Sequence, residues 1–246
     1  MEKDIKSVNV MLDFETLGQG HRPFLLCMSA VVFDLEGKGP NRASITDKHT
    51  LFARFDPKDQ DKLGRKIEPA TLNWWLKQTT NDGKPMLAEM LGGSYWSGVS
   101  LDVFYKQLKN FLFWHVAIKN RHLLNDMMVE STDENWHKYM VRNGWRASPV
   151  NHRPDELTEI AYKSLRMWAR GLDFDMRLMN EIVQDVGEEK AFWNYGLVRD
   201  VRTYLRAADV VAAKDHEGKH DPFQDCVKQI MDVQTANIIL HAIQRK

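Results

Sequence analysis

The chain has 246 residues and is 43% hydrophobic, which suits one large domain with a sizeable core. Lys plus Arg and Asp plus Glu both number 34, so the net charge is zero and a basic field over the whole protein is excluded. Any contact with nucleic acid must therefore come from a local patch. Residues 1–4 do not resemble a signal peptide, and the longest apolar run, 24–33, is too short to span a bilayer. We expect a cytoplasmic protein without a membrane partner.

The first predicted strand is the mostly apolar segment 8–12, and two acids follow it. Asp13 and Glu15 are spaced i, i+2, which puts both side chains on the same face of a strand. Neighbouring carboxylates at the end of a buried strand repel each other and are costly to desolvate. A divalent cation removes that cost, and oxygen ligands suit Mg²⁺ or Mn²⁺. An Asp-x-Glu triplet also arises by chance, but the strand before it and the Thr-Leu-Gly turn after it favour a functional site.

Two more strands are predicted close behind the first, at 24–34 and 50–55, and the short links between them favour an antiparallel meander. Residues 56–66 are polar and predicted to be irregular. A helix is expected over 69–78, with Leu72, Trp75 and Leu76 on its buried face. Trp74 falls on another face. It could stack on a nucleic-acid base or pack under a neighbouring loop.

A second helix is expected to begin after Ser100 as its N-cap, with a buried apolar stripe that reaches Leu112. Residues 116–158 are richer in His, Arg, Asn and Asp, and we interpret them as a helical insertion with a helix at 133–143. The histidines of this region lack the spacing of metal ligands. The two cysteines, Cys27 and Cys226, lie in apolar runs and are expected to be reduced core residues.

The C-terminal part alternates strands and helices. Strands are predicted at 161–169 and 191–195, and helices at 172–183, 198–208 and 222–244. Asp221 is the expected N-cap of the last helix, because Pro222 suits its first turn. This order of elements predicts an α/β or α+β sheet with helices on both faces.

Four acids and a histidine form an ordered set of motifs: Asp13-Phe-Glu15-Thr16, Phe174-Asp175-x-x-Leu178 and His220-x4-Asp225. In this order they resemble the three Exo motifs of the DEDDh 3′→5′ exonucleases. The nearest resemblance is to the phage exonuclease A (DexA) type, which has bacterial RNase AS among its relatives. Further similarity covers most of the chain outside 116–158 and includes 71–78, Arg170-Gly171, Trp193-Asn194 and 199–203.

The resemblance implies an RNase H-like fold in a single exonuclease domain, residues 1–246. Its mixed sheet would join a three-strand antiparallel meander to parallel strands, with helices on both sides. It also implies two divalent cations, Mg²⁺ or Mn²⁺, held by Asp13, Glu15, Asp175 and Asp225. Asp173 is a second candidate beside Asp175, but Asp175 follows the phenylalanine as the motif requires. The implied general base is His220, and the implied substrate-binding residues are Thr16, Leu17, Gly18 and Trp74.

The function favoured by this resemblance is a metal-dependent 3′→5′ exonuclease that removes nucleotides from DNA. Its partner would be a nucleic acid with a free 3′ end, expected to be single-stranded. An exoribonuclease of the RNase AS or oligoribonuclease kind is the close alternative, because a 2′-OH contact is not visible in the sequence. A non-catalytic nucleic-acid-binding module on the same fold is a third possibility, which the retention of all five site residues disfavours. If a phage encodes the chain, we expect it in the host cytoplasm.

Overall fold

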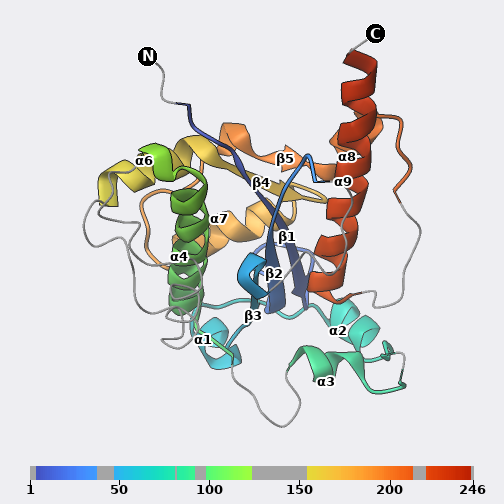
Figure 1. Ribbon diagram of the computed structural model, residues 1–246. Coiled ribbons are helices and arrows are strands. Elements are labelled where there is room, and N and C mark those ends of the chain that lie inside the picture. Colours follow the sequence, from blue (N-terminus) through green and yellow to red (C-terminus); the bar gives the residue numbers. More distant parts are fainter. Residues whose placement is uncertain are drawn as a thin grey trace.

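A five-stranded sheet in the order β3-β2-β1-β4-β5 organises the protein (Figure 1). The computed structural model describes residues 4–37, 47–80, 82–91, 98–123, 154–212 and 220–244. The central strand pairs antiparallel with β2 and parallel with β4, while β3 and β5 extend the two edges. The predicted mixed sheet of an RNase H-like nuclease is thereby confirmed. The strands are β1 (Val8–Thr16), β2 (Leu25–Phe33), β3 (Thr50–Arg54), β4 (Leu165–Ala169) and β5 (Arg199–Asp200).

Helices cover both faces of the sheet, as Figure 1 shows. Because side chains alternate along β1, Val10 and Leu12 point into the larger core under α4, α6 and α7, whereas Met11 points into a second core under α8 and α9. Asp13 and Glu15 follow the alternation of Met11 and therefore lie on the face that α9 covers. The helices on the two faces are α4 (Leu101–Lys119), α6 (Pro154–Ser164), α7 (Asp175–Asp185), α8 (Val201–Ala207) and α9 (Pro222–Gln244).

The predicted starts of the two longest helices in the described part of the chain are confirmed. The Ser100 hydroxyl accepts a hydrogen bond from the backbone N–H of Val103 and caps α4. Asp221 Oδ1 accepts from the backbone N–H of Phe223 at 2.9 Å and caps α9, which spans the residues expected of it. Each cap pairs a backbone donor that the first helical turn leaves without an intrahelical partner. The direction in which α9 leaves its cap brings its first turn to the end of β1.

Helix α2 (Pro69–Trp75) ends earlier than expected, and one of its predicted core residues is exposed. Trp75 is 2% exposed and Trp74 is 40% exposed, as their positions on the helix predict. Leu76 is 63% exposed, so its assignment to the buried face was wrong. The helix stops at Trp75, with Leu76 as its C-cap, and the helical stripe does not continue beyond that point.

Several element boundaries also differ from the sequence prediction. Residues 57–62, expected to be irregular, form α1 (Pro57–Lys62), because the Asp56 side chain accepts from Lys58 N and Pro57 occupies the first helical position. Residues 161–164, expected in a strand, complete α6, where Leu157, Ile160 and Ala161 make a buried helical stripe. Residues 191–195 are not a strand; the chain there enters a 3-10 turn, Tyr195–Leu197, before the short β5. A further short helix, α3 (Met86–Met90), was not predicted.

The expected insertion at 116–158 overlaps two core helices at its ends. Val116 is buried near the end of α4, and Leu157 is buried on α6, which packs against α4. Residues 124–153, which include the helix expected at 133–143, lie outside the described residues. Both cysteines are buried and free, as predicted. Among the described helices, none combines the length and apolar character needed to cross a bilayer.

Candidate active site

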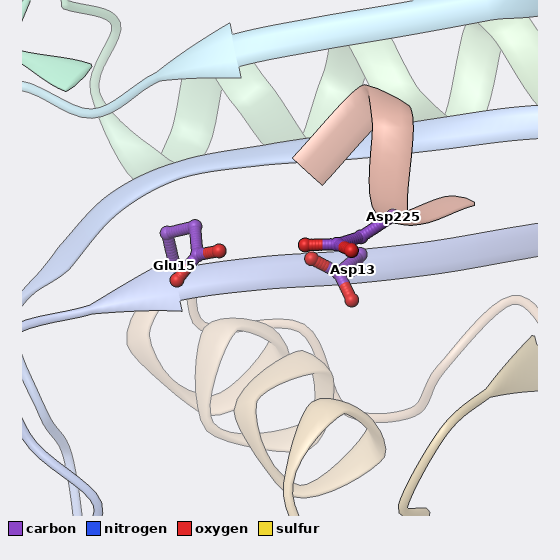
Figure 2. Close-up of side chains that lie close together, drawn as sticks. All are labelled: Asp13, Glu15 and Asp225. Carbon is purple, nitrogen blue, oxygen red and sulfur yellow. The ribbon is translucent and has the colours of Figure 1, made fainter. Parts of the chain in front are cut away.

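Three carboxylates meet where β1 ends and α9 begins. One oxygen from each of Asp13, Glu15 and Asp225 lies within 4.8 Å of the others, and we call these three residues the acid cluster. Figure 2 shows Asp13 and Glu15 along the same strand, with Asp225 reaching them from the first turn of the helix. Residues more than 200 positions apart are thus brought together by packing of α9 on the sheet. Oxygen ligands this close suit a hard divalent cation.

Asp175 adjoins the cluster from the other side of β1. It is buried at the start of α7, and its Oδ1 accepts a hydrogen bond from Phe14 N at 3.2 Å. Its charge is close enough to raise the pKa of Asp13. Asp173, the alternative from the sequence, is exposed. The structure therefore places Asp175, and not Asp173, beside the strand-end acids.

The acids are electrostatically strained as a group. Burial raises the pKa of Asp13 well above its ordinary value, and the charges of Asp175, Glu15 and Asp225 raise it further. Burial also raises the pKa of Glu15, with Asp225 and Asp175 adding to the effect. Burial raises the pKa of Asp175 to about 7, although the hydrogen bond from Phe14 opposes this. A bound cation would offset this repulsion, so the donor set fits Mg²⁺ or Mn²⁺.

His220 stands at the edge of the acid cluster. Its Nδ1 lies 3.9 Å from Glu15 Oε1, and its backbone N–H donates to Asp225 Oδ2 at 3.2 Å. The residue adopts φ 69°, a left-handed conformation that costs a non-glycine residue free energy. Its ring packs edge-on against Trp74, with the ring centroids 4.7 Å apart. The backbone contact with Asp225 and the ring contact with Trp74 therefore fix the imidazole near Glu15.

A pocket of about 550 Å³ opens beside the acid cluster. Its walls include Glu15 and Thr16 from the end of β1, Trp74 and Trp75 from α2, and His220. Trp75 is fixed because its Nε1–H donates to the backbone carbonyl of Thr16 at 2.9 Å. Two aromatic side chains at one hollow offer surfaces on which a nucleic-acid base can stack. Trp74 is thus partly exposed and forms part of the pocket wall.

Of the predicted substrate-binding segment Thr16-Leu17-Gly18, Thr16 lines this pocket and the other two residues are not part of its walls. The Thr16 hydroxyl donates to Gly18 O at 2.6 Å, and Leu17 itself is buried against α2. Glu68 holds the following turn, since its carboxylate accepts from Gln19 N and Gly20 N at 3.1 and 2.8 Å. A Cβ at Gly20 would come within 2.7 Å of that carboxylate, so only glycine fits there without a shift.

Two residues that support the site were missed in the sequence. Glu68 lies in the pocket wall, and the backbone hydrogen bonds from Gln19 and Gly20 lower its pKa. Gln229 Nε2 donates to Asp13 Oδ1 at 3.0 Å and orients that carboxylate. Gln229 follows Asp225 by four positions, so the two share a helix face, and this spacing could have identified it. Glu68 carries no comparable signal apart from its place before Pro69 at a helix start.

The strand-end acids, the histidine and the aromatic pocket thus lie together at one end of this sheet. The family model of the 3′-5′ exoribonuclease Rv2179c-like domain matches residues 8–237. The chain belongs to this family, and membership supports a nuclease with a nucleic-acid substrate. Among curated proteins, no sequence matches the chain significantly.

Proposed function

We propose that the protein is a metal-dependent 3′→5′ exonuclease of the DEDDh type, which removes nucleotides from single-stranded nucleic acid. The observation that carries the proposal is the acid cluster with His220 at its edge, opening onto an aromatic pocket. The membership of the chain in an exoribonuclease family supports the same reaction.

Asp13, Glu15 and Asp225 would hold the divalent cations, with Asp175 contributing from the start of α7. When bound, such cations stabilise the negative charge that develops on the attacking and leaving oxygens. The chain itself supplies the ligands at a defined spacing, and Gln229 keeps the Asp13 carboxylate in its orientation. The mutual repulsion of the acids supports the proposal, because bound cations would offset it.

His220 would act as the general base that takes a proton from the attacking water. An imidazole titrates near neutral pH, which suits this role. A general base must reach its proton at about 2.6–3.2 Å from heavy atom to heavy atom, so its position must be defined. The contacts of His220 with Trp74 and Asp225 provide that definition. A strained backbone at this residue is consistent with a functional constraint.

The choice between RNA and DNA depends on the sugar. The description of the family favours RNA, whereas the resemblance to the phage exonuclease A type favoured DNA. Recognition of RNA requires a contact to the 2′-OH, and Glu68 offers an acceptor in the pocket that holds the terminal nucleotide. RNA is therefore the first substrate to test and DNA the second.

The test is incubation with 5′-labelled single-stranded RNA and DNA, each with Mg²⁺, with Mn²⁺ and with EDTA. We expect a ladder that shortens from the 3′ end, formed with either cation and not with EDTA. A substrate blocked at its 3′ end should resist degradation. Products that appear internally from the start, or degradation that persists in EDTA, would contradict the proposal.

A further inference from the structure

A second pocket, of about 760 Å³, lies on the other side of Trp74 and His220 from the first. Its walls come from β3, from the segment between α2 and α3, from α3 itself and from the start of α9. Figure 1 shows these elements gathered at the end of the sheet where α9 begins. Trp74 and His220 line both pockets and therefore form the wall between them.

The strand register puts the second pocket in line with the acid cluster. Asp13 pairs with Ser29, and Ser29 pairs with Phe52. Directly paired residues of neighbouring antiparallel strands project from the same face of a sheet. Phe52 therefore projects from the face that carries Asp13, two strands away, which is a lateral distance of about 10 Å.

The same register repeats two residues further along β1. Glu15 pairs with Cys27, and Cys27 pairs with Arg54. An aromatic ring and a guanidinium group thus follow the two acids across the sheet in matching order. Ser29 and Cys27 between them are fully buried, so a substrate strand would reach these two side chains across Trp74 and His220, which line the same pocket.

Phe52 and Arg54 form a platform suited to a nucleotide. Phe52 is 41% exposed although its neighbours Leu51 and Ala53 are buried, and the Arg54 guanidinium lies 5.0 Å from the centre of its ring. Arg54 is held there by hydrogen bonds to the carbonyl oxygens of Met90 and Glu89, which leave its positive charge in place. An exposed ring offers a stacking surface to any base, and the guanidinium can face a phosphate.

Acidic groups also line this pocket, and they weaken its electrostatic attraction for the phosphates of a nucleic acid. Asp82, Glu89 and Asp221 belong to its walls, and Lys84 forms an exposed ion pair with Asp82 at 2.8 Å. A binding mode based on general attraction to phosphates is therefore disfavoured. Stacking on Phe52 carries the contact, with Arg54 as the nearest cation to the ring.

We propose that the second pocket binds the penultimate nucleotide of the substrate, with its base stacked on Phe52. This inference rests on the proposed exonuclease function. The bond that is cleaved joins the terminal nucleotide to the penultimate one, so the two nucleotides must lie on either side of the reacting groups. The wall formed by Trp74 and His220 provides that division: the terminal nucleotide occupies the first pocket and the remaining strand leaves through the second.

The test uses single-stranded pentanucleotides, of whichever sugar the wild-type enzyme cleaves, with either a normal or an abasic penultimate nucleotide. For the wild type, removal of that base should lower kcat/KM roughly 5- to 150-fold, the loss expected for one base stack. Phe52→Ala should lower kcat/KM by a similar factor on the normal substrate. On the abasic substrate Phe52→Ala should match the wild type, because each change removes the same contact.

Two variants control for structural effects. Phe52→Trp keeps a stacking surface and should retain the wild-type response to the abasic substrate. Tyr162→Ala removes an aromatic side chain of similar exposure, 44%, from α6 on the opposite side of the sheet and should change neither reaction. Losses that multiply when Phe52→Ala meets the abasic substrate would overturn the inference, as would unchanged cleavage of the normal substrate. Failure of the wild type to cleave either substrate would instead overturn the proposed function and, with it, this inference.

Discussion

Two groups of carboxylates in this protein have opposite electrostatic surroundings. The acid cluster of Asp13, Glu15 and Asp225 collects like charges, which raise the pKa of Asp13 and Glu15 beyond the effect of burial. The second group, Glu181 and Asp185 on α7, is paired with arginines and we call it the paired cluster. Asp185 lies 2.7 Å from Arg65 and 2.6 Å from Arg22, and Glu181 lies 3.0 Å from Arg177.

The difference between these clusters distinguishes a structural role from the metal-binding role proposed for the acid cluster. In the paired cluster the protein supplies its own cations, so the group joins the loop after β1 to α7 without an external ion. Arg177 also donates to Gly20 O at 2.6 Å. In the acid cluster three carboxylates lie together, and the partly buried His220 lies 3.9 Å from one of them, Glu15. Such a group of carboxylates can bind a cation from solution, as a metal-dependent enzyme requires.

The largest expected effect comes from removing one acid of the cluster. Asp13→Ala and Glu15→Ala should abolish hydrolysis, because each removes a ligand of the proposed metal site. Without metal, each variant should have an unfolding temperature equal to or higher than that of the wild type, because the repulsion between the carboxylates is reduced. The checks are a turnover assay in Mg²⁺ and thermal unfolding in EDTA. Turnover near the wild-type rate in either variant would end the metal-site interpretation.

Replacement of His220 should have the next largest effect. His220→Ala should lose roughly 10²–10⁴-fold in turnover, the usual contribution of general acid–base catalysis, and flatten the acidic limb of the pH–rate profile. His220→Gly should be equally inactive but more stable than His220→Ala by about 1 kcal/mol, since glycine accepts the φ of 69°.

The matched control for His220 is His216, which lies outside the described residues. His216→Ala should remain within a few-fold of wild-type turnover. An inactive His216→Ala together with an active His220→Ala would show that the third motif has been assigned to the wrong histidine.

The paired cluster should respond through stability instead of turnover. Asp185→Asn leaves the fully buried Arg65 side chain without its main anion and should cost about 3–5 kcal/mol of unfolding free energy. Asp102→Asn is the control, because its ion pair with Lys106 is exposed and should contribute less than about 1 kcal/mol. Chemical denaturation measures both. A loss no greater for Asp185→Asn than for Asp102→Asn would remove the distinction drawn between the clusters.

Trp74 should affect substrate binding by a smaller amount. Trp74→Ala should weaken binding of a single-stranded substrate by roughly 1–3 kcal/mol, the range for one base stack. Trp75→Ala should instead lower stability, because it removes a buried ring and its hydrogen bond to Thr16. Since Trp74 also packs on His220, KM and kcat should be measured separately. An unchanged KM with a reduced kcat would assign Trp74 to positioning of the histidine.

The stability of the metal-free protein should also depend on pH. Asp175 has a pKa of about 7 in the folded state against an ordinary value of 3.8, so the folded state binds more protons between these values. Stability should therefore fall as pH rises from about 4 to 7, and thermal unfolding in EDTA should give a lower unfolding temperature at pH 7 than at pH 4. Mg²⁺ should reduce this dependence. An unfolding temperature that rises over this range in EDTA would contradict the raised pKa of Asp175.

The sequence by itself determined the elements whose pattern is local. The strand-end acids, the alternation that puts them on one face, the cap of α9 and the exposure of Trp74 all follow from residues within a few positions of each other. It failed where a boundary depends on a neighbour: residues 161–164 complete a helix because α4 offers a surface to pack on, and Leu76 is exposed because α2 ends before it.

Only the tertiary structure decided which of these residues meet. Asp225 reaches Asp13 because α9 packs across β1 and β2, and Gln229 reaches the same carboxylate from the next turn. The alignment of Phe52 with Asp13 depends on the register of three strands, which the spacing of residues along the chain does not specify. Long-range pairing is set by the burial of whole faces, whereas the motifs are set by neighbouring residues. The motifs of the site are therefore visible in short stretches of sequence, whereas their assembly into one site depends on contacts between distant parts of the chain.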